Sequence, residues 1–316
     1  MSADQPTVSP AYHPRRVARS RFVKVRMLDV HVHEWGDPSL VTPERPAVVM
    51  VHGWMDVGAS FQFVVDALQQ DRYVIAPDWR GFGLTQGPAT DNYWFGDYLG
   101  DLDLLLDAMN LGTPEQPIDL VGHSMGGNIV MTYAGVCPKR IRTLVNLEGF
   151  GMPRTDPKDA PGRYAGWLYQ LKNPVDLKDY DSLDAVAARM QKNNPRLPLD
   201  RARWLANHWA RRTEAGRWVI NGDPAHKRIN PQLYRVEEAL ACWGAITAPV
   251  LVVDAGIDET KRWWGDAYPR SEFHERLKAV PDSRCATIQD AGHMLHHDQP
   301  AELAELLENF WSAGVP

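Results

Sequence analysis

The stretch at residues 118–131, IDLVGHSMGGNIVM, constrains the fold of this chain more than any other. It opens with closely spaced apolar residues, as in a buried strand, and apolar residues recur at helical spacing from Ile129. Between the two lies GHSMG (122–126), an instance of G-x-S-x-G. So tight a turn needs small residues beside the serine, and it leaves that serine exposed with strained backbone angles. The pattern predicts that Ser124 is a nucleophile at the start of a helix.

Short apolar runs alternate with amphipathic helical patterns along most of the chain. This rhythm is typical of an α/β fold, in which a mostly parallel sheet is covered by helices on both faces. The expected strands are 47–51, 73–76, 118–121, 144–147, 249–253 and 285–288, preceded by a hairpin of 22–25 and 30–33. The expected helices are 61–68, 95–109, 271–279 and 301–310.

The pattern is interrupted between residues 152 and 246, which predicts an insertion. This segment lacks obvious strand patterns and contains five tryptophans (Trp167, Trp204, Trp209, Trp218 and Trp243). Helices are expected at 182–192, 199–213 and 232–244. We therefore expect a helical cap at 152–246, inserted after the strand that follows the nucleophile helix. Residues 21–151 and 247–316 would form the core, and residues 1–20, which are polar and contain proline, a loose arm.

The amino-acid composition indicates in which environment the protein works and which partners it can bind. Of the 316 residues 44% are hydrophobic, which suffices for a large core, and the formal net charge of −6 argues against nucleic acid as a partner. Three scattered cysteines are typical of reduced thiols. Neither a signal peptide nor a membrane span is apparent. We expect a soluble cytoplasmic protein, and the sequence leaves its oligomeric state open.

A serine hydroxyl needs an imidazole to accept its proton, and the imidazole needs a carboxylate to orient it. His293 follows the last expected strand, so its loop could return over Ser124. Two carboxylates compete for the third role. Asp258 follows the penultimate strand and gives the chain order serine, acid, histidine, so it is preferred. Glu148, directly after the strand that follows the elbow, is the alternative, and Asp254 is assigned a structural role.

The oxyanion formed during attack on a carbonyl needs two backbone donors. The N–H of Met125, next to the nucleophile, should be one, and that of Trp54, in the loop after an earlier strand, should be the other. We also expect the Trp54 side chain to line the pocket.

The remaining histidines receive no role in the reaction. His52, His123 and His297 are interpreted as structural, and the ring of His52 is expected to bond nearby backbone. His31 and His33 lie two apart on one strand face, which we interpret as solvated, because no third metal ligand is evident.

Four segments together carry a resemblance to a known family: HGW (52–54), DWRGFG (78–83), GHSMGG (122–127) and GH (292–293). In this combination the chain resembles the α/β-hydrolase superfamily over residues 21–151 and 247–314, and within it the capped serine esterases and serine hydrolase-like proteins. LEG (147–149) and MP (152–153) are also similar to haloalkane dehalogenases, in which the acid can follow this strand. Those enzymes use an aspartate nucleophile, and Ser124 in that position argues against their activity.

The expected function is hydrolysis of carboxylic esters through an acyl-enzyme on Ser124, in an apolar pocket beneath the aromatic-rich cap. The substrate would be a small-molecule ester, with no cofactor and no metal. Hydrolysis of a carbon–carbon bond, a lactone or a thioester could use the same three residues. The non-enzymatic alternative is a binding protein that has this fold and has lost catalytic activity.

Overall fold

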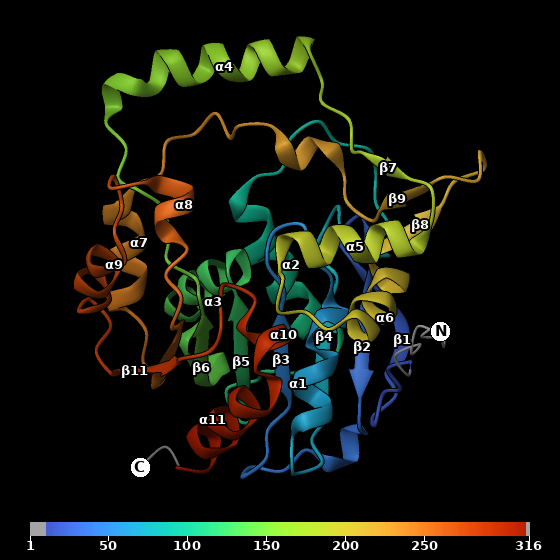
Figure 1. Cartoon of the computed structure of the whole chain (residues 1–316). Helices are drawn as coiled ribbons and strands as arrows, with labels where there is room; N and C mark the ends of the chain where they lie inside the picture. Colours follow the sequence, from blue (N-terminus) through green and yellow to red (C-terminus); the bar gives the residue numbers. More distant parts are fainter. Residues whose placement is uncertain (1–10, 314–316) are drawn as a thin grey trace, which may run out of the picture.

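The computed structural model describes residues 11–313. Eight strands form one sheet in the order β1-β2-β4-β3-β5-β6-β10-β11 (Figure 1). β2 pairs antiparallel with both β1 and β4, whereas the pairs from β4 to β11 are parallel. The strands are β1 (Arg19–Val25), β2 (Leu28–Trp35), β3 (Val48–Val51), β4 (Val74–Pro77), β5 (Ile118–His123), β6 (Ile141–Leu147), β10 (Val250–Ala255) and β11 (Ser283–Ile288). The predicted mostly parallel α/β sheet is confirmed.

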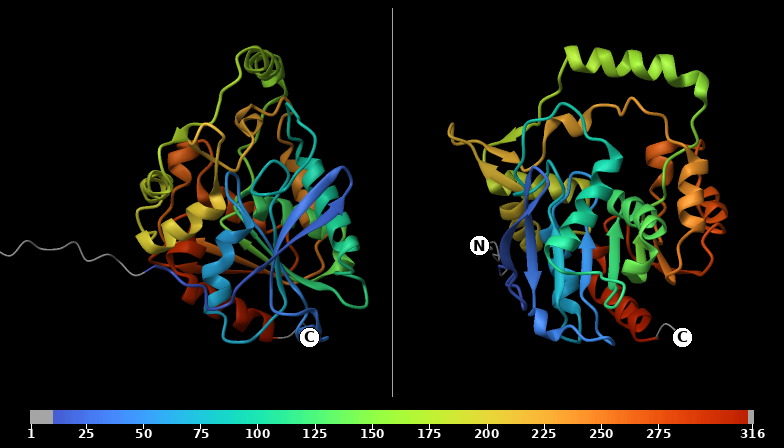
Figure 2. Two further views of the ribbon diagram at one scale, coloured as in Figure 1. Left: turned by 90° about the vertical axis from the view of Figure 1, so that its right-hand side faces the viewer. Right: turned by 180° about the vertical axis from the view of Figure 1, so that it is seen from behind.

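Helices cover both faces of this sheet, as the views in Figure 2 show. On one face the core contains side chains from α2 (Phe95–Ala108), α3 (Met125–Val136), α7 (Val236–Gly244) and α9 (Arg270–Leu277). On the other face it contains side chains from α1 (Gln62–Ala67), α10 (Leu295–Asp298) and α11 (Pro300–Ser312). Because the central strands are buried on both faces, they consist of nearly continuous apolar residues.

The segment between β6 and β10 lies over the carboxyl ends of the strands (Figure 1). It contains α4 (Ala160–Lys172), β7 (Asp179–Tyr180), α5 (Leu183–Asn193), α6 (Leu199–Trp209), β8 (Ala210–Arg212), β9 (Trp218–Ile220) and α7. The segment expected to be a helical cap is helical only in part, because β7, β9 and β8 form a second, three-stranded sheet. Strands of two or three residues are too short to show the alternation from which we predict strands.

Two parts of this segment attach to the core differently. α5 and α6 form a small hydrophobic core with Val57 and Phe63, while α7 packs against α3 of the main fold. α4, which precedes these helices in the chain, spans the top of the molecule (Figure 1), and none of its side chains is buried. The limits of the cap at 152 and 246 remain a prediction. Because α7 packs against α3, the last ten or so residues of the predicted cap belong with the core.

The amino-terminal segment differs from the expected loose arm over residues 11–18. The backbone N–H groups of Arg15 and Arg16 donate to Asp66 at 2.9 and 2.7 Å, and Tyr12 Oη also donates to that carboxylate. Gln62 Nε2 donates to the Arg16 carbonyl at 2.8 Å. These bonds tie the segment to α1, and a polar sequence gave no sign of them. Residues 1–10 of the predicted arm lie outside the described residues.

Within residues 11–313, no helix has the length and apolar character needed to cross a bilayer.

The remaining α-helix is the short α8 (Thr260–Trp264). The described residues also form 3-10 turns at η1 (Pro38–Leu40), η2 (Gly58–Phe61), η3 (Pro138–Arg140), η4 (Pro157–Asp159) and η5 (Pro224–Lys227).

Two helical glycines provide a test of the packing of α7 on α3. A Cβ at Gly135 in α3 would overlap the carbonyl of Cys242 in α7, whereas a Cβ at Gly166 in α4 would meet nothing within 4 Å. We expect Gly135→Ala to lower the free energy of unfolding by about 1–3 kcal/mol through overpacking. We expect Gly166→Ala to raise it by about 0.5–1 kcal/mol, because alanine is the better helix former. Chemical denaturation measures both, and equal effects would contradict this packing.

Candidate active site

Ser124 lies in a strained turn between β5 and α3. Its backbone has φ 53° and ψ −115°, outside the regions that non-glycine residues favour, and its N–H donates to the Leu147 carbonyl at 2.8 Å. The flanking glycines permit the turn: a Cβ at Gly122 would overlap the Gly126 carbonyl, and one at Gly126 would overlap the Val51 carbonyl. The turn thus has the predicted elbow geometry.

The loop after β3 approaches the serine from the other side. A Cβ at Gly53 would lie 3.0 Å from Ser124 Cβ, an unusually tight contact, so glycine favours this close approach of the backbone. Trp54 follows directly, and Met125 is the first residue of α3, where its N–H has no acceptor within the helix. The Trp54 indole is half exposed and donates to the His226 carbonyl at 3.3 Å, linking this loop to the segment above the sheet.

His293 reaches Ser124 from the loop after β11. Its Nε2 lies 2.9 Å from Ser124 Oγ, so that the hydroxyl can donate to the ring. Glu259 accepts from the His293 backbone N–H at 3.0 Å, and His123 Nε2–H donates to the His293 carbonyl at 2.8 Å. The ring packs edge-on against Trp263, with centroids 4.4 Å apart. Backbone and ring are therefore both held in place.

Glu148 is the carboxylate in contact with this imidazole. Its Oε2 lies 3.3 Å from His293 Nδ1, while Oε1 accepts from the Ala255 N–H at 2.6 Å and lies 3.7 Å from the Arg270 guanidinium. The residue follows β6 directly, is 1% exposed and has φ 56°. A buried carboxylate with a left-handed backbone is costly, and such strain concentrates at functional sites.

The preference for Asp258 as the partner of His293 is wrong in this structure. Asp258 Oδ1 accepts from the Thr260 N–H at 2.9 Å and from Thr260 Oγ1 at 2.5 Å, and it lies 3.6 Å from Arg270. These bonds orient the carboxylate toward the start of α8, and its side chain is 40% exposed. Although its partial burial raises the pKa of Asp258, the bonds from Thr260 hold it below its usual value. The order of residues along the chain does not reveal these local hydrogen bonds to Thr260.

Asp254 pairs with another histidine, as its structural assignment implied. His274 Nε2 lies 2.8 Å from Asp254 Oδ2, at the end of β10.

Burial acts on both members of the Glu148–His293 pair. It raises the pKa of Glu148 to about 8, against the opposing effects of the Ala255 N–H and the Arg270 guanidinium. It lowers the pKa of His293 to about 4. Both shifts have the same cause, which is that a charge in this water-poor site costs more than in solvent.

Three residues of the site were missed by sequence reasoning: Arg270, Glu259 and Trp263. Arg270 donates to the Ala255 carbonyl at 2.6 Å and lies over the Phe150 ring, so it supports the Glu148 carboxylate from α9. None of the three belongs to a short sequence pattern. Their roles follow only from the way the loops after β6, β10 and β11 meet.

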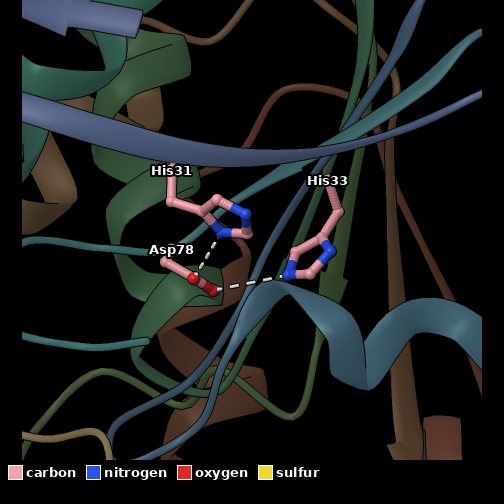
Figure 3. A group of neighbouring side chains, drawn as sticks. All are labelled: His31, His33 and Asp78. Atoms are coloured by element: carbon pink, nitrogen blue, oxygen red, sulfur yellow. Dashed lines mark hydrogen bonds and ion pairs between the residues drawn. The ribbon is translucent and has the colours of Figure 1, made fainter. Parts of the chain in front are cut away.

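The histidines that we interpreted from the sequence as having no role in the reaction, His31, His33, His52, His123 and His297, are all buried. His52 has the expected bonds to backbone: Nδ1–H donates to the Gly53 carbonyl at 2.7 Å, and Nε2 accepts from the Trp79 N–H at 2.9 Å. The expected solvated face for His31 and His33 is wrong, because these side chains are 0% and 6% exposed. No sequence pattern indicated their buried partner Asp78, whose Oδ2 lies 2.8 Å from His31 Nδ1 and whose Oδ1 lies 4.0 Å from His33 Nε2 (Figure 3).

Two groups combine two histidines and an aspartate closely enough to hold a metal ion: His31, His33 and Asp78, and a second group of Asp56, His296 and His297.

Comparison with known proteins agrees with this fold. A family model described as alpha/beta hydrolase fold matches residues 46–300. A cis-3-alkyl-4-alkyloxetan-2-one decarboxylase of Shewanella oneidensis is 28% identical, over 83% of this chain and 81% of the relative. A 3-hydroxybutyrate-oligomer hydrolase of Cupriavidus necator is also 28% identical, over 86% and 89%. The solved thioesterase domain from the curacin biosynthetic pathway superposes with a TM-score of 0.78 at 23% identity, over 93% of this chain and 99% of that domain. The chain belongs to the alpha/beta hydrolase family.

Proposed function

We propose that this protein is a serine hydrolase of carboxylic esters, with Ser124 as nucleophile, His293 as general base and Glu148 as the acid of the triad. The observation that carries the proposal is the continuous contact from Ser124 Oγ through both ring nitrogens of His293 to a buried carboxylate, at 2.9 and 3.3 Å. Serine is a poor nucleophile until a base accepts its proton, and this arrangement supplies one.

The reaction proceeds in two stages. Ser124 Oγ attacks the ester carbonyl carbon as its proton passes to His293 Nε2, and Glu148 stabilises the resulting imidazolium through Nδ1–H. The N–H groups of Trp54 and Met125 donate to the oxyanion. His293 then protonates the leaving alcohol, and water activated by the same ring hydrolyses the acyl-enzyme. The chain's own groups account for every proton transfer.

The side chains around Ser124 favour an apolar substrate. Two exposed indoles belong to this region: Trp54, in the loop whose Gly53 approaches Ser124, is 51% exposed, and Trp263, which packs on the His293 ring, is 41% exposed. α4, at the top of the molecule (Figure 1), carries the exposed Tyr164 and Leu168. Apolar side chains of this kind fit short or medium acyl or aryl groups. Because no side chain of α4 is buried, its movement toward the core could enclose a substrate.

The relatives agree with hydrolysis and do not single out one reaction. One is named as a hydrolase of 3-hydroxybutyrate oligomers and another as a decarboxylase. Hydrolysis of a carbon–carbon bond in a diketone would use the same triad. A panel of acyl esters, a thioester, a lactone and a vinylogous diketone separates these reactions, and we expect the esters to have the highest kcat/KM.

Ser124→Ala should lower kcat on a chromogenic acyl ester by about 10⁵–10⁶-fold, because the variant has no nucleophile. A fluorophosphonate should label the wild-type protein at Ser124 within the time of the assay and leave the variant unlabelled. Mass spectrometry of the labelled peptide locates the adduct. An inert binding protein would not be labelled in either form, and a fully active variant would contradict the assignment.

Glu148→Gln should lower kcat by about 10⁴-fold, because glutamine cannot stabilise the imidazolium. Asp258→Asn is the matched control, and its effect on kcat should be far smaller, because Asp258 bonds Thr260 instead of His293. The reverse order of the two effects would restore Asp258 as the acid.

The pH profile of kcat/KM shows whether Glu148→Gln loses activity because Glu148 acts on His293 or because the variant no longer folds. The active state forms when the Glu148–His293 pair loses one proton, and burial of Glu148 raises that apparent pKa toward about 8. Activity should therefore rise with pH through this range. In Glu148→Gln the residual activity depends on His293 alone, whose pKa burial lowers below 6.5, so its acid limb should lie at lower pH. An unchanged limb would show that Glu148 does not share the titrating proton.

A further inference from the structure

A second polar group is buried a few residues away from the triad. Asp56 lies in the loop after β3, close to Trp54, and His296 and His297 lie in α10, just after His293. The three side chains are at most 5% exposed, and one ligand atom from each lies within 4.8 Å of the others. The group therefore links the loop of the proposed oxyanion donor to the loop of the general base.

Several polar atoms of this group have no hydrogen-bond partner among residues 11–313. They are Asp56 Oδ2, both ring nitrogens of His296, and His297 Nε2. The other oxygen of Asp56 accepts from Ser60 Oγ and from Trp209 Nε1, at 3.2 Å for the indole. Oδ2 instead faces His296 Nε2 at 3.7 Å, too far for a hydrogen bond. Buried groups are nearly always paired, so this many unpaired atoms in one place call for an occupant.

His31, His33 and Asp78 form a group of the same composition (Figure 3), but its carboxylate and His31 already have hydrogen-bond partners within the protein. Asp78 accepts from the Gly58 N–H at 2.7 Å, the Leu84 N–H at 2.9 Å and His31 Nδ1–H at 2.8 Å. The second nitrogen of His31 accepts from Ser20 Oγ at 2.6 Å. Because the carboxylate and His31 are already bonded, a metal ion would have to break these bonds to bind there.

Charge also favours a cation beside Asp56. A buried carboxylate is costly unless a positive group or a metal compensates it. The guanidinium of Arg201 donates to the His297 carbonyl at 3.4 Å and stacks on Phe63, on the far side of that histidine. Two neutral imidazoles and one carboxylate are a ligand set suited to zinc and similar divalent ions, which tolerate a water as fourth ligand.

We propose that Asp56, His296 and His297 bind one divalent transition-metal ion of the zinc class. The site is separate from the hydrolytic steps, and it departs from the sequence-based expectation of no metal. By joining the loop after β3 to α10, the ion would hold the segment that carries His293 in position. This role is structural, so it can be measured without substrate.

The test uses full-length protein without a polyhistidine tag, produced in medium supplemented with either Zn²⁺ or Co²⁺ so that the ion can enter before the site closes. After dialysis, elemental analysis should find one metal ion per chain, and the Co²⁺ form should show the visible absorption of a four- or five-coordinate ion. The metal-loaded protein should have a higher Tm than protein produced without added metal.

His297→Gln removes one ligand and should lower affinity by more than about 100-fold, since loss of even an outer partner costs about 10–100-fold. Asp56→Asn is a second variant with the same expected loss, in case either replacement disturbs folding, which circular dichroism would reveal. His33→Gln, in the hydrogen-bonded group of His31, His33 and Asp78, is the matched control, and this variant should still bind one ion per chain.

Absence of bound metal in the wild-type protein would overturn the proposal and leave ordered water as the occupant. Equal metal content in wild type, His297→Gln and Asp56→Asn would also overturn it, as would loss of metal only in His33→Gln.

Discussion

A carboxylate shielded from water determines the geometry of this site. Glu148 contacts His293 on one side and receives the Ala255 N–H on the other. These residues meet because β10 runs parallel to β6, with Val253 opposite Leu147, and because the Glu148 N–H donates to the Val253 carbonyl at 3.2 Å. The register of two strands therefore places this carboxylate beside His293. Burial tends to protonate it, while the Ala255 amide and the Arg270 guanidinium favour the anion that the proposed reaction needs.

Backbone strain gathers around the same point. Five non-glycine residues among 11–313 have positive φ, and three of them, Met55, Ser124 and Glu148, lie in the loops that form the site. Each costs free energy that the surrounding fold must offset. The well-packed parallel strands below supply that support, and the close contacts at Gly53, Gly122 and Gly126 leave the loops little room to relax.

The sequence was sufficient to predict the sheet, most helices and the pairing of Ser124 with His293, because strand and helix periodicity and the G-x-S-x-G turn are local signals. It was not sufficient to choose between Glu148 and Asp258. Glu148 follows β6, which lies beside the nucleophile strand β5, and Asp258 follows β10, the next strand of the sheet. The choice rests on the hydrogen bonds of Asp258 to Thr260. The small sheet of the cap was also missed, because its strands have only two or three residues. The burial of His31 and His33 was missed because it depends on contacts with distant segments, such as the pairing with Asp78.

The most direct measurement is a crystal structure of the protein after reaction with a fluorophosphonate ester. The account predicts phosphorus bonded to Ser124 Oγ, a phosphoryl oxygen accepting from the amides of Trp54 and Met125, and the ring of His293 still in contact with Glu148. An adduct on another residue, or an imidazole turned toward Asp258, would contradict it.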